Sequence, residues 1–214
     1  MSSFTQVQAC LQLAFHWASD GRGPVSTYES ASTAHFISGR TETIRSASAE
    51  AAAFVQSVAS NASREEQVAR LRASAGRHAA LAKEAARGDG IDRHLYALRA
   101  LAEGQKSAAG AGGSGEAASH PSALSAAAFF ADPTYHAVTS NELSTSTLTD
   151  PFSRQAAFGP VHAEGYGVSY HLPSTRLKFC VTTYAPRDSG AFAGALERAL
   201  LHVQDLMAAG DTAP

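Results

Sequence analysis

The chain has 214 residues, a formal net charge of −2 and two cysteines, and 17% of its residues are charged. This near-neutral balance argues against a nucleic-acid-binding protein, which usually carries a basic excess, and two cysteines cannot make a disulfide framework or a zinc ligand set. The chain contains no run of 18 apolar residues, so no membrane span is predicted, and residues 1–8 lack the pattern of a secretory signal. We therefore expect an intracellular protein that is long enough to bury one substantial core.

Alanine is the most frequent residue, at 45 of the 214 positions or about 21% of the chain. Alanine buries little surface but has the highest helix propensity. The composition therefore predicts a helix-rich protein whose large apolar side chains are concentrated in a few places.

Apolar side chains recur at helical spacing through much of the first half of the chain. We expect helices over residues 6–17, 47–60, 64–86 and 91–105. Ser63 and Glu66 form a capping-box pattern where the third of these helices begins, and Gly88 and Gly90 follow its end. The polar residues 25–46 show no clean period, and we interpret them either as a site-bearing segment or as a solvated loop.

Low complexity interrupts the pattern after the fourth expected helix. Residues 107–119 are almost entirely Ala, Gly and Ser, which indicates an insertion loop or, alternatively, a domain boundary. We favour the insertion because neither flank has an obvious core of its own. A short helix over 124–130 is expected next. The chain is thus interpreted as one domain over 1–210 with a short tail over 211–214.

The β signal comes late in the chain. Apolar and polar residues alternate over 166–170 and again over 177–181, which predicts a β-hairpin. Asp188 or Ser189 is expected to cap a final helix that Gly210 stops. The fold class predicted is α/β, with many helices and a small mixed or antiparallel sheet.

Four separated segments of the chain carry distinctive motifs. They are Thr-Tyr-Glu-Ser-Ala-Ser with Gly-Arg-Thr-Glu-Thr-Ile-Arg-Ser over 27–46, Gly-Ile-Asp-Arg-His-Leu over 90–95, Phe-Ala-Asp-Pro-Thr-Tyr with Leu-Ser-Thr-Ser over 130–146, and Phe-Gly-Pro-Val with Glu-Gly-Tyr-Gly-Val over 158–168. In this order the chain resembles the choline/carnitine O-acyltransferases. The resemblance implies the C-terminal half of their chloramphenicol acetyltransferase-like fold, and transfer of an acyl group between acyl-coenzyme A and the carnitine hydroxyl.

The resemblance also implies a carnitine-binding set. Its members are Tyr28, Ser30, Thr41, Arg93 and Phe158. A carboxylate such as that of carnitine needs a fixed cation and several donors, which a guanidinium and hydroxyls supply, and an aromatic ring suits the trimethylammonium group. The alternative for Arg93 is a salt bridge to Asp92 or another nearby acid. Thr41-Glu42-Thr43 favours carnitine over choline, because the choline-specific members lack this Thr-x-Thr arrangement.

Other family positions concern the acyl-coenzyme A side of the reaction. By the resemblance, Ser146 is the oxyanion hydroxyl, Thr147 stands where a glutamine usually contacts coenzyme A, and Ala79 stands where many members have a coenzyme A arginine. Ala156 and Ala157 precede the Phe-Gly-Pro motif and are small enough to leave room for a medium or long acyl chain. The carnitine half-site is therefore expected to be intact, whereas the coenzyme A half-site departs from the family pattern.

His16 and Asp20 fit a His-x-x-x-Asp-Gly pattern that related acyltransferases use in catalysis. A histidine whose tautomer is fixed by an aspartate can act as a general base. The family match instead places this stretch at the end of an amphipathic helix, so we treat His16 as a decoy.

The resemblance further implies that the family's histidine base and its coenzyme A lysines lie on a part of the enzyme outside this chain. The chain is then a carnitine O-acyltransferase fragment that needs a missing N-terminal half in cis or in trans, in the mitochondrion or the peroxisome. No metal or bound cofactor is expected, and acyl-coenzyme A is the co-substrate. The alternatives are a non-catalytic domain that binds carnitine or a protein partner, and a truncated product without function.

Overall fold

The computed structural model describes residues 3–110, 121–147, 155–171 and 177–208. The helices are α1 (Ser3–Ala18), α2 (Ala49–Ala59), α3 (Arg64–Ala86), α4 (Asp92–Gly110), α5 (Pro121–Phe130), α6 (Pro133–Thr139) and α7 (Ser189–Ala208). The strands are β1 (Thr27–Ser32), β2 (Thr41–Ile44), β3 (Leu143–Thr147), β4 (Tyr166–His171) and β5 (Lys178–Thr183). The predicted α/β class is confirmed.

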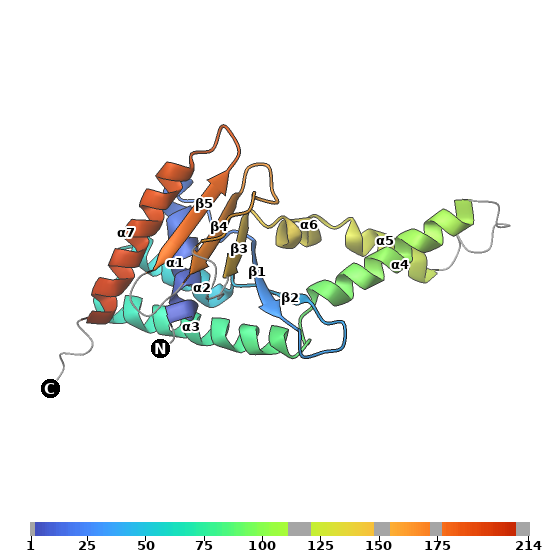
Figure 1. The fold of residues 1–214 in the computed structure, drawn as a ribbon, viewed down its shortest axis with the longest axis horizontal. Coiled ribbons are helices and arrows are strands. Elements are labelled where there is room, and N and C mark those ends of the chain that lie inside the picture. The colour runs from blue at the N-terminus through green and yellow to red at the C-terminus, as the bar shows by residue number, and fades with distance from the viewer. Residues whose placement is uncertain (1–2, 111–120, 148–154, 172–176, 209–214) are drawn as a thin grey trace.

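The five strands form one mixed sheet in the order β2-β1-β3-β4-β5 (Figure 1). The central strand β3 pairs in parallel with β1 and with β4, whereas β2 and β5 pair antiparallel with their neighbours at the two edges. The predicted hairpin is confirmed, because Val168 lies opposite Val181 and Tyr170 opposite Phe179.

Helices cover one face of this sheet. The helices α1, α3 and α7 pack on the sheet side, and α2 packs against α1 and α3 (Figure 1). Tyr166 of β4 stacks on Phe192 of α7 with ring centroids 4.2 Å apart, and Phe15 of α1 meets the same tyrosine edge-on at 6.5 Å. This apolar face is the core that holds β3 and β4 in place.

Helix caps agree with the sequence signals. The Ser63 hydroxyl accepts a hydrogen bond from the Glu66 amide at 3.2 Å, and the Asp188 carboxylate accepts one from the Gly190 amide at 2.7 Å. The expected helices over 6–17, 47–60 and 64–86 are confirmed to within a few residues at their ends.

The strands β1, β2 and β3 were not predicted as strands, and neither was α6. Polar residues occupy both faces of β1, since Glu29 is buried beneath the sheet while Tyr28 and Ser30 face the opposite way. A strand of this kind has no alternation of apolar and polar residues, which is the signal that sequence patterns use.

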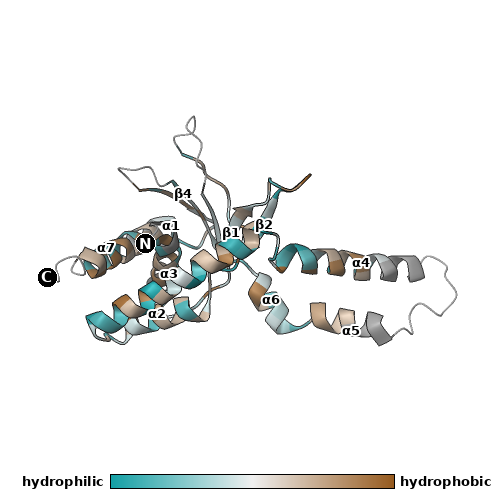
Figure 2. Ribbon diagram, turned by 90° about the horizontal axis from the view of Figure 1, so that it is seen from below, coloured by the Kyte–Doolittle hydropathy of each residue, from teal (hydrophilic) through white to brown (hydrophobic). Residues whose placement is uncertain are grey.

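The helices α4, α5 and α6 extend away from the sheet, and α4 and α5 lie side by side (Figures 1 and 2). The expected loop over 107–119 begins later than predicted, because α4 continues to Gly110. The remainder of that loop and the 211–214 tail lie outside the described residues.

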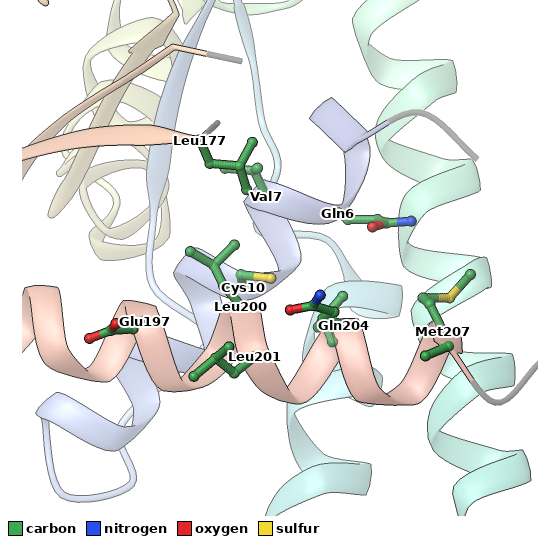
Figure 3. A pocket seen from close by; sticks show the side chains of 11 residues that line it. Gln6, Val7, Cys10, Leu177, Glu197, Leu200, Leu201, Gln204 and Met207 are labelled. Atoms are coloured by element: carbon green, nitrogen blue, oxygen red, sulfur yellow. The ribbon is translucent and has the colours of Figure 1, made fainter. Parts of the chain in front are cut away.

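An apolar pocket lies between α1 and α7, lined by Val7 and Cys10 of α1 and by Leu200 and Met207 of α7 (Figure 3). The Cys10 side chain is fully buried at the edge of this pocket, and burial raises the pKa of its thiol to about 12. The neutral thiol is a poor nucleophile at ordinary pH.

We therefore expect iodoacetamide at pH 8 to modify the partly exposed Cys180 and to leave Cys10 unmodified until the chain is unfolded in urea. Peptide mass spectrometry of native and unfolded samples measures both rates. Equal modification of the two cysteines in the native protein would contradict the buried position of Cys10.

Candidate functional site

Hydroxyl side chains line the face of the sheet that lies opposite the helical layer. Successive side chains on a strand point to opposite faces, and directly paired residues share a face. Tyr28 pairs with Ser144, and Ser146 pairs with Ser169, so these residues lie together on the open face. On β1 to β4 this open face carries partly exposed residues, which are Tyr28, Ser30, Thr41 and Ser146, and buried ones, which are Thr43, Ser144 and Ser169.

Arg93 lies at the β2 edge of the open face. It is the second residue of α4, and its guanidinium donates to the Thr41 carbonyl oxygen at 2.9 Å and to the Thr41 hydroxyl at 3.2 Å. These bonds direct the guanidinium to the strand that carries the Thr-x-Thr motif. Arg93 and Thr41, two members of the set expected from the sequence, therefore lie in direct contact.

Asp92 has a different partner from the one considered in the sequence analysis. Its carboxylate accepts two hydrogen bonds from the Arg45 guanidinium in a bidentate ion pair, and Arg45 Nε lies 3.0 Å from one carboxylate oxygen. The alternative interpretation, in which Arg93 forms a salt bridge with Asp92, is therefore wrong. Arg45 also binds the Asn141 side chain at 2.5 Å, which ties the start of α4 to the loop before β3.

The Glu42 carboxylate completes the edge beside Arg93. It is 3% exposed, and it accepts the Thr43 amide at 2.7 Å and the Arg93 amide at 3.4 Å. A carboxylate at the first turn of a helix is favourable because it complements the helix dipole. A Cβ on Gly90 would lie 2.3 Å from the Glu42 side chain, so glycine at this position lets the chain pass close to the carboxylate.

The segment over residues 155–160 crosses the other end of the open face. The Thr182 hydroxyl donates to the Phe158 carbonyl at 2.5 Å, and the Ser169 hydroxyl donates to the Ala156 carbonyl. A Cβ on Gly167 would lie 2.7 Å from the Phe158 carbonyl, so the segment sits directly on β4. Phe158, Ala156 and the more exposed Ala157 are thereby brought beside the strand that pairs with β3.

The arrangement therefore offers a fixed cation at one edge, a row of hydroxyl donors across β1 and β3, and an aromatic and alanine segment over β4. This donor set suits a ligand with a carboxylate, and hydroxyls on β3 can stabilise a developing oxyanion. A sequence model of the family described as "Choline/Carnitine o-acyltransferase" matches residues 1–198. The chain belongs to the choline/carnitine O-acyltransferase family.

Named relatives agree with this assignment. The chain is 36% identical over 187 residues to carnitine O-palmitoyltransferase 2, mitochondrial, from Homo sapiens, covering 86% of this chain and 26% of that protein. It is 33% identical to carnitine O-acetyltransferase from Mus musculus, covering 94% and 30%. It is 34% identical to choline O-acetyltransferase from Gallus gallus, covering 94% and 29%. The chain thus spans between a quarter and a third of the length of these acyltransferases.

Two residues singled out from the sequence lie away from the open face of the sheet. His16 is near the end of α1 in the helical layer, where its Nδ1 lies 3.3 Å from the Arg22 carbonyl. Thr147 follows Ser146 on β3 and therefore points to the opposite face, where it pairs with Tyr170. Its buried hydroxyl makes no hydrogen bond within residues 3–110, 121–147, 155–171 and 177–208.

Ser144 and Thr43 belong to motifs noted in the sequence, but their place on this face of the sheet, together with that of Ser169, was not predicted. Their signal is alternation in register with Tyr28 and Ser146, which becomes visible only once β1, β2 and β3 are known to be strands. Over the part of the chain that the structure describes, no three His, Cys, Asp or Glu side chains gather in a metal-binding group. No helix among those residues is both long and apolar enough to cross a membrane.

Proposed function

We propose that this chain carries the carnitine-binding half-site of a carnitine O-acyltransferase. The observation that carries the proposal is the Arg93 guanidinium bonded to the Thr41 hydroxyl at 3.2 Å, at the edge of a sheet face that also presents Tyr28 and Ser146. A planar guanidinium fits a carboxylate in a two-pronged geometry, which is the group that distinguishes carnitine from choline.

Each remaining residue has a role in this proposal. Tyr28, Ser30 and Thr41 donate to the carnitine carboxylate, and Phe158 borders the trimethylammonium group. Ala156 and Ala157 border the acyl chain, so replacement of Ala156 by methionine in a complete enzyme is expected to shorten the preferred acyl group. Thr147 is assigned to the coenzyme A side by its position next to Ser146 on β3, while its side chain points to the helical face.

These residue roles lead to the following proposed reaction in the complete enzyme. A histidine base on a part of the enzyme outside this chain takes the proton of the carnitine hydroxyl, and the hydroxyl oxygen forms a bond to the thioester carbonyl carbon. Ser146 donates to the oxygen that becomes negative. The carbon–sulfur bond then breaks, coenzyme A leaves as its thiolate, and the proton returns to the sulfur. We propose residues 1–210 as a partial domain of this fold, working in the mitochondrion or the peroxisome.

A non-catalytic domain that binds carnitine, or a protein partner, is the second candidate. The feature that favours it is Thr147, where the family usually has glutamine and where the side chain lies on the helical face. A chain with the carnitine residues but without coenzyme A contacts would bind carnitine and transfer no acyl group.

Release of free thiol from acyl-coenzyme A separates the two candidates. The purified chain is mixed with acyl-coenzyme A, with and without carnitine, and the thiol is followed with a chromogenic disulfide. We expect no carnitine-dependent release from this chain alone and restored release when a base-bearing N-terminal half is added. Release by the chain alone that His16→Ala abolishes would contradict the outside base and support His16 instead.

Native size tests the fragment proposal independently. An antibody against residues 196–207 in an immunoblot of cell extract is expected to detect a band far above 22.2 kDa. A band at 22.2 kDa would instead require a separate subunit that supplies the histidine.

A further inference from the structure

A continuous network of buried polar side chains lies beneath the open face, on the helical side of the sheet. Its members are Gln8 of α1, Glu29 of β1, Ser46 after β2, His78 of α3, Thr145 of β3 and Tyr170 of β4. All six are buried, and the His78 and Glu29 side chains are only 6% and 4% exposed. The family resemblance gave a role to none of them.

Glu29 is the charged centre of the network. His78 Nε2 lies 2.6 Å from one of its carboxylate oxygens, and the Tyr170 hydroxyl donates to the other at 2.7 Å. Burial and the Glu29 charge together raise the pKa of Tyr170, so its hydroxyl keeps the proton that it donates. A buried carboxylate is costly unless both oxygens are satisfied, so α3 and β4 are held to β1 at this point.

Gln8 joins Glu29 to the strand that carries Ser146. Its side-chain amide donates to the Thr145 hydroxyl at 3.0 Å and to the Tyr170 hydroxyl at 3.3 Å, and its carbonyl accepts from Ser46 at 2.9 Å. The Thr145 hydroxyl donates onward to the Tyr28 carbonyl at 2.8 Å. Each donor that Gln8, Ser46, Thr145 and Tyr170 contribute meets an acceptor, so a change at one of them leaves a neighbour unpaired, whereas the buried Nδ1 of His78 has no hydrogen-bond partner among the described residues.

The pleat of the sheet connects this network to the site. Glu29 lies between Tyr28 and Ser30 in the chain, and Thr145 lies between Ser144 and Ser146. The side chains of the network residues point to the helical side of the sheet, whereas those of their neighbours in the chain point to the open face. The network therefore fixes the position and register of β1 relative to β3. This sets the distance between Tyr28 and Ser30, the proposed donors to the carnitine carboxylate, and Ser146, the proposed oxyanion donor.

We propose that Glu29, held between His78 and Tyr170 and linked through Gln8 to Thr145, is a positioning residue that fixes Tyr28 and Ser30 relative to Ser146. This inference rests on the proposed function, because it assigns the network to the carnitine site. It concerns side chains that touch neither carnitine nor coenzyme A.

Glu29→Gln is the first variant for the test, because it keeps the shape and places an amide donor against a donating neighbour. We expect the variant to fold and to bind L-carnitine about tenfold or more weakly, since a buried unsatisfied polar group distorts its surroundings. Unchanged affinity in a folded Glu29→Gln protein would overturn the proposal.

Gln8 and Gln12 provide a matched pair for a second comparison. Both are fully buried on α1 one turn apart, but Gln12 bonds to Val25 and to Thr27 at the start of β1, whereas Gln8 bonds to Ser46, Thr145 and Tyr170. Gln8→Met and Gln12→Met remove the same group, and both are expected to lower thermal stability. Only Gln8→Met is expected to weaken carnitine binding several-fold.

NMR of the free protein tests the positioning role of the network separately from the proposed carnitine binding. Amide signals of Ser30, Ser144 and Ser146 are expected to shift in Gln8→Met and to stay in place in Gln12→Met, whether or not carnitine binds. Absence of carnitine binding by the unmodified chain would contradict the proposed function, and the amide shifts would still decide the positioning role. Equal shifts in both variants would overturn that role.

Discussion

Replacement of Arg93 by glutamine is expected to weaken L-carnitine binding by about tenfold to a hundredfold, because hydrogen bonds to charged groups contribute about 1.5–3 kcal/mol. The guanidinium already bonds to Thr41 at 2.9 and 3.2 Å at the edge of the open face, and we propose that its charge meets the carnitine carboxylate there. Calorimetric titration of the purified variant measures the change.

Arg99→Gln is the matched control for charge. Arg99 lies on the same helix and pairs with Glu103 at 2.8 Å, at a distance from the open face. The two variants lose the same charge from α4. A drop in affinity that is the same in both would mean that the net charge of α4, and not the position of Arg93, attracts the ligand.

Replacement of Phe192 by alanine is expected to lower the free energy of unfolding by about 3–5 kcal/mol, the usual range for loss of a buried phenylalanine. Phe192 is fully buried and stacks on Tyr166, so it joins α7 to the strand beside the site. A domain of this size has roughly 5–15 kcal/mol of stability, so the loss is a large share of the total. Urea unfolding followed by circular dichroism measures it.

Leu201→Ala on the same helix is the control, because Leu201 is 55% exposed. Its expected cost is about 0.5 kcal/mol or less. Similar losses in the two variants would contradict the packing of α7 on β4.

The helices could be predicted from the sequence because their apolar faces are regular. Leu11 and Phe15 on α1, and Leu196 and Val203 on α7, all recur at helical spacing and are all buried. The hairpin of β4 and β5 was predictable for the same reason, since its alternate residues meet the helical layer.

The strands that carry the site could not be found in this way. Glu29 of β1 and Thr145 of β3 are polar and yet face the protein interior, where the buried network satisfies them. Thr27 of β1 is also buried, and its hydroxyl accepts a hydrogen bond from Gln12. A pattern method assigns such residues to solvent. The same interior polarity explains why the hydroxyls of the candidate site could be recognised from the sequence, whereas the side chains beneath them could not.

The family motifs placed Thr41 and Arg93 in one expected set, and the structure brings the two side chains into contact. The alternative ion pair of Arg93 with Asp92 was wrong because Arg45, 47 residues before Asp92 in the chain, takes that carboxylate. Adjacency in sequence was a poor guide here, since the first turn of a helix spreads neighbouring side chains over different directions.

NMR titration of the chain with L-carnitine and with choline tests the central claim most directly. The account predicts saturable shifts of the Arg93 Nε–H signal and of the Tyr28 and Thr41 amides with carnitine, and no saturable shifts with choline, which lacks the carboxylate. Absence of saturable shifts with carnitine, or equal shifts with both ligands, would contradict a carnitine half-site on this sheet face.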